Sequence, residues 1–159
     1  MSALVSRAAA LRPFSRRGSI SALRSGARLV DDSYNASPAA TRTMLAALKA
    51  TTVSGRRVAV IGEMLELGDA TRELHAECGR AAVAAGVEEL VVIGGAGANA
   101  LADAAAQAGL DRSRIHRFVE SRSAADAIAG IVRSGDVVLV KGSRGTRVDV
   151  VSDRLQEVG

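Results

Sequence analysis

Short apolar runs, each followed by an alanine-rich stretch with helical spacing, constrain the fold of this chain more than any other feature. A continuous apolar run, such as residues 57–62, is typical of a strand in a sheet that is covered on both faces. Strands that alternate with helices are joined by crossover connections, which produce parallel pairing. We therefore expect an α/β fold: a three-layer, Rossmann-like domain with a mainly parallel sheet of about six strands.

The expected strands are residues 19–23, 28–31, 57–62, 89–93, 114–119 and 137–140. The expected helices begin near Ser37, Asp69, Ala98 and Ser123, and a last helix ends near Glu157. Helix caps are expected at Ser37, Asp69 and Ser121, because side-chain oxygens accept hydrogen bonds from unpaired backbone N–H groups. No linker interrupts residues 28–158, so the sequence predicts one domain over residues 14–159, preceded by a separate segment, 1–13.

Composition excludes several classes of function. The 159 residues include two Phe, one Tyr and no Trp, too few aromatic side chains for a single-strand nucleic-acid platform. A single cysteine, Cys78, excludes an internal disulfide and a multi-cysteine metal site, and its helical position predicts a core thiol. No apolar stretch reaches the length of a membrane span. We expect a cytoplasmic protein that binds neither membrane nor nucleic acid.

The first thirty residues are basic and contain no carboxylate. Six arginines precede the first acid, Asp31, whereas the rest of the chain is nearly balanced in charge. Such a segment is compatible with an organellar transit peptide, with a nucleic-acid-binding arm, or with the exposed seam of a neighbouring domain. Composition alone leaves these three alternatives open.

Residues 30–38 place polar side chains between a strand and a helix. Asp31, Asp32, Tyr34 and Asn35 lie in this loop, and Pro38 suits the first position of the helix that follows. Ligands of open α/β folds bind at the carboxyl ends of the strands. The stretch is therefore a candidate ligand site, and the alternative is a capped loop with solvated acids.

Two further loops are expected at the same edge. Lys141, Ser143 and Arg144 follow a strand and suit an anion such as a carboxylate, unless they only neutralise nearby helix acids. Glu63 and Glu66 follow another strand and suit a cation or an ammonium group, although solvated loop acids are commoner.

Other motifs are weak or absent. Gly95, Gly97 and Ala100 have the spacing of a dinucleotide fingerprint, but a tight glycine turn explains them better. No Gly-x-x-x-x-Gly-Lys-Ser/Thr phosphate loop occurs in the sequence. His75 is expected on a helix surface, and His116 has no partner nearby in sequence. We identify no metal site and no pair of nucleophile and base.

Three long motifs, in this order and spacing, closely resemble the C-terminal domain of the Mur ligase family over about residues 14–158. The first is Asp31-Asp32-Ser33-Tyr34-Asn35-Ala36-Ser37-Pro38, the second is Val60-Ile61-Gly62-Glu63-Met64-Leu65-Glu66-Leu67-Gly68 followed by His75, and the third is Gly135-Asp136-Val137-Val138-Leu139-Val140-Lys141-Gly142-Ser143-Arg144. Among family members, those that add D-alanyl-D-alanine to UDP-N-acetylmuramoyl-tripeptide are the most similar. One departure is Ser37, where the family usually has Asn.

The resemblance implies a role in peptidoglycan precursor synthesis. In this family ATP phosphorylates a substrate carboxylate, an amine attacks the acyl phosphate, and a central domain carries the phosphate loop and Mg²⁺. The C-terminal domain closes over the site. By resemblance, the ATP-binding residues would be Arg17, Asp32, Tyr34, Asn35 and Pro38. The residues that bind D-alanyl-D-alanine would be Lys141, Ser143, Arg144 and Glu63.

The sugar-peptide domain, the phosphate loop and the magnesium ligands have no counterpart in this sequence. We therefore expect a monomeric part of an ATP-dependent ligase that is inactive alone and meets the UDP-sugar peptide through other domains. Residues 1–13 would be the remnant of a preceding helix or linker, which favours the seam explanation of the basic segment. The alternative is a stand-alone Rossmann-like binding or regulatory module that has lost ligase activity, and an NAD-binding enzyme ranks third.

Overall fold

The computed structural model describes residues 15–158, so the expectation for residues 1–13 lies outside the described part. The strands are β1 (Ser19–Ala22), β2 (Arg28–Asp32), β3 (Arg57–Gly62), β4 (Val87–Ile93), β5 (Ile115–Phe118) and β6 (Val137–Lys141). The helices are α2 (Pro38–Ala50), α3 (Thr71–Ala84), α4 (Ala96–Gln107), α5 (Ser121–Ile131) and α6 (Asp149–Val158). None of these helices is long and apolar enough to cross a membrane.

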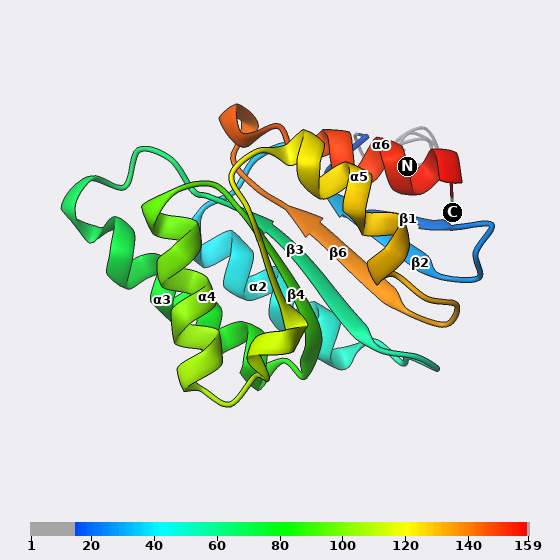
Figure 1. Ribbon diagram of the computed structural model, residues 1–159, viewed down its shortest axis with the longest axis horizontal. Coiled ribbons are helices and arrows are strands. Elements are labelled where there is room, and N and C mark those ends of the chain that lie inside the picture. Colours follow the sequence, from blue (N-terminus) through cyan, green and yellow to red (C-terminus); the bar gives the residue numbers. More distant parts are fainter. Residues whose placement is uncertain (1–14, 159) are drawn as a thin grey trace, which may run out of the picture.

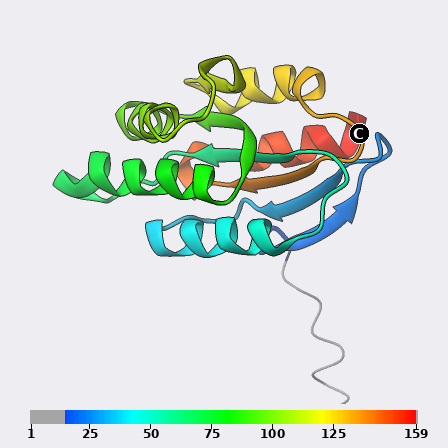
Figure 2. The same ribbon diagram turned by 90° about the horizontal axis from the view of Figure 1, so that it is seen from below.

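The six strands form one sheet in the order β1-β2-β6-β3-β4-β5, in which β1 is antiparallel to β2 and all other pairs are parallel. Helices α2, α3 and α4 cover one face, and α5 and α6 cover the other (Figures 1 and 2). The predicted three-layer fold with a mainly parallel sheet is therefore confirmed.

Alternating residues of the central strands build two separate cores. Ala59 and Ile61 of β3 point to the face of α2, α3 and α4, whereas Val58 and Val60 point to the face of α5 and α6. Such strands are apolar along their whole length because both of their faces are buried. This explains why the apolar runs of the sequence mark the central strands so clearly.

The helix ends agree with the sequence only in part. Ser37 caps α2, as predicted, by accepting a hydrogen bond from the backbone N–H of Ala40. The cap expected at Asp69 is wrong: a 3₁₀ turn spans Gly68–Ala70, and α3 begins at Thr71. The cap expected at Ser121 is also wrong, because Ser121 is the first residue of α5 and its hydroxyl donates to the carbonyl of Thr146.

Candidate functional site

The strand order creates a crevice at the carboxyl edge of the sheet, where β2 and β6 lie side by side. The chain leaves β2 for α2 on one face of the sheet, and it leaves β6 for α6 on the other face. Neighbouring strands whose connections diverge in this way form the usual ligand crevice of an open α/β sheet. Asp32 ends β2 and Lys141 ends β6, so both residues stand at the crevice.

An ion pair joins the two strands at this point. The Lys141 Nζ lies 2.5 Å from the Asp32 Oδ2 and donates a second hydrogen bond, of 3.0 Å, to the carbonyl of Asn35. The Lys141 side chain is only 3% exposed, and that of Asp32 is 16% exposed. The family resemblance implies that Asp32 binds ATP and that Lys141 binds the dipeptide, whereas the structure brings the two side chains into direct contact.

Tyr34 is the centre of a cationic cluster beside this pair. The guanidinium carbon of Arg17 lies 4.2 Å from the centroid of the Tyr34 ring, and that of Arg144 lies 5.9 Å from it. Both distances suit cation–π attraction, which holds arginine side chains over an aromatic face. Within residues 15–158, neither Arg17 nor Arg144 forms an ion pair with a carboxylate. The structure therefore brings together Arg17, Tyr34 and Arg144, three predicted site residues that lie far apart in the sequence.

A cavity of about 340 Å³ opens next to the Tyr34 cluster. It is lined by Arg16, Ser33, Tyr34, Arg144, Arg147 and Asp149. Burial raises the pKa of Asp149, but hydrogen bonds from Arg147 and the charge of Arg16 outweigh this effect and hold the pKa below its usual value. Arg16 pairs with both Asp149 and Asp153, and Arg147 pairs with Asp149, whereas Arg144 has no carboxylate partner among residues 15–158. The cavity therefore keeps a net positive charge, carried by Arg144, that suits an anion such as a phosphate chain.

Glu63 lies at the same edge of the sheet but binds the protein itself. Its Oε2 accepts a hydrogen bond from the backbone N–H of Gly95 at 2.8 Å, and its Oε1 accepts one from that of Gly97 at 2.6 Å. A side chain on Gly97 would collide with Glu63 and His75, so this close approach requires glycine. The carboxylate occupies the helix N-terminus where a dinucleotide would place its pyrophosphate. The geometry therefore argues against the NAD-binding alternative.

The residues after Glu63 are fixed by two other elements. The imidazole Nε2 of His75 accepts the backbone N–H of Met64 at 2.8 Å, and the hydroxyl of Ser143 accepts that of Leu65 at 3.0 Å. The surface position expected for His75 is wrong, because its side chain is fully buried and its Nδ1 lies 2.7 Å from the carbonyl of Thr71. Loop 63–65 is thereby tied in succession to α4, to α3 and to the loop after β6.

A second, more open cavity of about 540 Å³ lies on the other side of the segment from Ser143 to Arg147. Its lining includes Glu63, Leu65, Val119, Glu120, Arg122, Gly145, Thr146 and Arg147. Arg147 lines both cavities and has a left-handed backbone conformation with φ 53°. The loop after β6, at the top of Figure 1, therefore forms the wall between the two cavities.

The remaining predicted residues, Asn35 and Pro38, follow Tyr34 in the chain but are not in the lining of either cavity. Asn35 is exposed, and Pro38 is the partly exposed first residue of α2. The described residues contain no group of three or more His, Cys, Asp or Glu side chains that could hold a metal ion.

One charged cluster was missed by sequence reasoning. At the opposite edge, Glu89 accepts hydrogen bonds from Arg56 at 2.5 Å and Arg114 at 2.6 Å, and its Oε2 lies 3.0 Å from His116. Arg56 also pairs with the buried Asp136 at 2.7 Å. Because these charges satisfy one another at the amino ends of the strands, away from both cavities, the cluster is structural. Only the strand order brings them together, and the sequence carried no signal of it.

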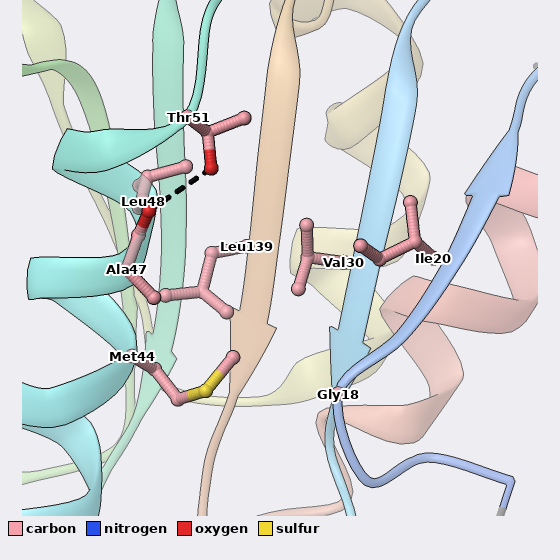
Figure 3. A pocket seen from close by; sticks show the side chains of 8 residues that line it. All are labelled: Gly18, Ile20, Val30, Met44, Ala47, Leu48, Thr51 and Leu139. Carbon is pink, nitrogen blue, oxygen red and sulfur yellow. Dashed lines mark hydrogen bonds between the residues drawn. The ribbon is translucent and has the colours of Figure 1, made fainter. Parts of the chain in front are cut away.

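An apolar pocket of about 130 Å³ also lies apart from the candidate site (Figure 3). It is lined by Gly18, Ile20, Val30, Met44, Ala47, Leu48, Thr51 and Leu139. None of these side chains is ionisable and none was a predicted site residue, so the pocket lacks the groups that would bind a phosphate or a peptide.

Comparison with known proteins agrees with the motifs. A family model described as "Mur ligase, glutamate ligase domain" matches residues 16–144. The UDP-N-acetylmuramoyl-tripeptide–D-alanyl-D-alanine ligase of Mycobacterium tuberculosis is 36% identical over 147 residues, which cover 82% of this chain and 29% of that protein. The same ligase of Mycobacterium leprae is 34% identical over 161 residues, which cover 92% of this chain and 31% of that protein.

Solved structures show the same relationship. The MurF ligase of Thermotoga maritima, determined in complex with ADP, superposes with a TM-score of 0.74 at 29% identity. The match covers 94% of this chain and 32% of the Thermotoga chain. This chain thus spans less than a third of the length of these relatives.

Proposed function

The chain belongs to the Mur ligase family, and from this we propose that it is the C-terminal domain of an ATP-dependent ligase. The reaction would join D-alanyl-D-alanine to UDP-N-acetylmuramoyl-tripeptide in peptidoglycan precursor synthesis, as in the relatives that match most of the chain. Because the match covers less than a third of those relatives, the activity requires parts that this sequence does not contain. The domain would act by enclosing the reactants.

The single observation that carries the proposal is the electropositive cavity beside Tyr34. Arg17 and Arg144 flank the ring without carboxylate partners in the described part of the chain, so their charges are available to phosphate oxygens. We propose that Arg17 contacts the ATP phosphates, and that Tyr34, Asn35 and Pro38 border the adenine and ribose. In the Thermotoga relative a nucleotide, ADP, is bound.

For the dipeptide, Arg144 fits the expected role better than the other predicted residues. The polar groups of the other three already have partners in the protein: Lys141 binds Asp32, Ser143 accepts the N–H of Leu65, and Glu63 binds the N-terminus of α4. Arg144 projects from the wall between the two cavities, where it could bind the terminal carboxylate of D-alanyl-D-alanine. The neighbouring cavity, with Leu65, Glu120 and Arg122 in its lining, would receive the rest of the peptide.

ATP would supply the phosphoryl group that activates the tripeptide carboxylate, and Mg²⁺ would neutralise the charge of the ATP phosphates. The described residues contain no cluster of acids that fits Mg²⁺, so we assign the metal to the domain that carries the phosphate loop. The residues of this chain would orient the nucleotide and the dipeptide and exclude water. Such positioning accounts for a large part of catalysis when two charged reactants must meet.

The test is turnover with UDP-N-acetylmuramoyl-tripeptide, D-alanyl-D-alanine, ATP and Mg²⁺, with and without a protein that carries the other two domains of a relative. We expect activity only in the mixture. A folded chain that binds neither ADP nor dipeptide and adds nothing to the mixture would favour the alternative, a binding or regulatory module that has lost the activity. Turnover by the chain alone would contradict the proposal that it is only part of the enzyme.

A further inference from the structure

The Lys141–Asp32 pair carries an inference about which ligand Lys141 serves. We propose that Lys141 is a positioning residue for the nucleotide loop, residues 32–37, and makes no contact with the dipeptide. The inference rests on the proposed function and changes the role that the sequence resemblance implies for Lys141.

The first argument is how the lysine ammonium group is engaged: two of its three N–H groups already donate to the protein. Its Nζ donates to the Asp32 Oδ2 and to the Asn35 carbonyl, inside a site where the side chain is 3% exposed. To reach a ligand in either cavity, this buried ammonium group would have to leave the partly buried carboxylate of Asp32 without its partner. Breaking such a pair is unfavourable, because the remaining charge loses its compensation and regains little water.

The second argument is the register of the sheet. Lys141 and Asp32 are direct neighbours in the parallel pair of β6 and β2, and each is the last residue of its strand. The ion pair therefore joins the strand ends at the point where the nucleotide loop begins. Neither cavity has Lys141 or Asp32 in its lining.

The third argument is how the loop is held. Ser33 is fixed by Asp31, and the N–H of Tyr34 donates to the carbonyl of Arg16. Lys141 fixes the residues on either side of these two, Asp32 and Asn35. The ring of Tyr34 thus lies between the two anchors that Lys141 provides, and the guanidinium carbon of Arg17 lies 4.2 Å from its centroid. Loss of the lysine should displace the ring and, with it, Arg17.

The chain offers an unusually simple control, because Lys49 and Lys141 are its only lysines. Lys49 lies exposed near the end of α2. We would titrate the full chain with ADP and, separately, with D-alanyl-D-alanine, following backbone amide signals by NMR. Lys141→Met should weaken ADP binding by about tenfold, because the loop that contacts the nucleotide is no longer preorganised. It should leave dipeptide affinity unchanged, and Lys49→Met should change neither.

A double mutant separates positioning from direct contact and guards against loss of the fold. In Asp32→Asn/Lys141→Met both charges are gone, so no carboxylate is stranded. If Lys141 acts by positioning, the effects of Lys141→Met and Asp32→Asn on ADP binding should be clearly less than additive, because either change removes the anchor between these two residues. Independent, additive effects, or weaker dipeptide binding in both backgrounds, would overturn the proposal.

A measurement without any ligand distinguishes this proposal from the proposed function. In the unmodified chain, acetic anhydride should acetylate Lys49 and spare Lys141, and Asp32→Asn should make Lys141 reactive. Amide hydrogen exchange at residues 33–36 should accelerate in Lys141→Met. Unchanged exchange would refute the positioning role, whereas failure of the unmodified chain to bind ADP would count against the proposed nucleotide site alone.

Discussion

The contact between Glu63 and the first turn of α4 provides the sharpest test of how the site is built. In Glu63→Gln the side-chain oxygen can still accept from Gly97, but the new amide group faces the N–H of Gly95, which it cannot accept. One charge-assisted hydrogen bond is lost and the other becomes neutral. The two bonds join α4 to the loop after β3, so the change should destabilise the whole domain.

The magnitude follows from the exposure of the two bonds. A hydrogen bond to a charged group contributes about 1.5–3 kcal/mol and a neutral one about 0.5–1.5 kcal/mol. A negative charge at a helix N-terminus adds about 0.3–1 kcal/mol. The bond to Gly95 is exposed to solvent and that to Gly97 is partly buried, so we take values near the lower ends. The expected loss in the free energy of unfolding is about 2 kcal/mol.

Urea denaturation of the purified chain measures this loss as a shift of the midpoint at constant m value. Glu66→Gln is the matched control, because Glu66 lies exposed in the same loop and should change the stability by less than about 0.5 kcal/mol. If Glu63→Gln is also within about 0.5 kcal/mol of the unmodified chain, the capping role is refuted. Weaker dipeptide binding at unchanged stability would instead support Glu63 as a ligand of the dipeptide.

Three further predictions concern the rest of the domain. Burial raises the pKa of Asp136, but hydrogen bonds from Arg56 and from the N–H of Arg133 outweigh this effect and hold the pKa below its usual value. The ionised carboxylate therefore stabilises the fold above about pH 4, and this stabilisation is lost on acidification. Asp136→Asn should lower the free energy of unfolding at pH 7 by about 3 kcal/mol, and stability measured by urea denaturation should then fall less steeply towards acidic pH. Burial raises the pKa of Cys78 to about 11, so Ellman's reagent at pH 8 should label it only in the unfolded chain, and labelling within seconds under native conditions would contradict its core position. Ser37→Ala should cost about 1 kcal/mol by removing the cap of α2, while Ser37→Asn keeps it, and equal urea midpoints for the two variants would disprove the cap.

The sequence predicted those features that local pattern determines. The central strands were recognisable because burial on both faces requires continuous apolar runs, as in residues 57–62. The cap at Ser37 was recognisable because its partner lies three residues away. The arrival of three loops at one edge followed from parallel pairing alone.

Features that depend on strand order were not predictable in the same way. His75 looked like a surface residue because acidic residues flank it, yet loop 63–65 folds back and buries its ring. Glu89 meets Arg56 and Arg114 only because β4 lies between β3 and β5. The contact between Lys141 and Asp32 spans 109 positions and requires β6 to insert beside β2.

The same contacts divide the predicted site residues into two physical kinds, and variants of each should fail differently. Lys141, Ser143 and Glu63 hold one loop to another, so their removal changes geometry and should appear in stability or amide exchange before ligand binding is measured. Arg17 and Arg144 have no carboxylate partners among residues 15–158, so their removal should leave the fold intact and weaken anion binding alone. If all of these side chains contacted ligands, every variant would be expected to weaken ligand binding and leave the fold intact. The structure predicts two outcomes, because a polar group that already holds a partner within the protein must release that partner before it can bind a ligand.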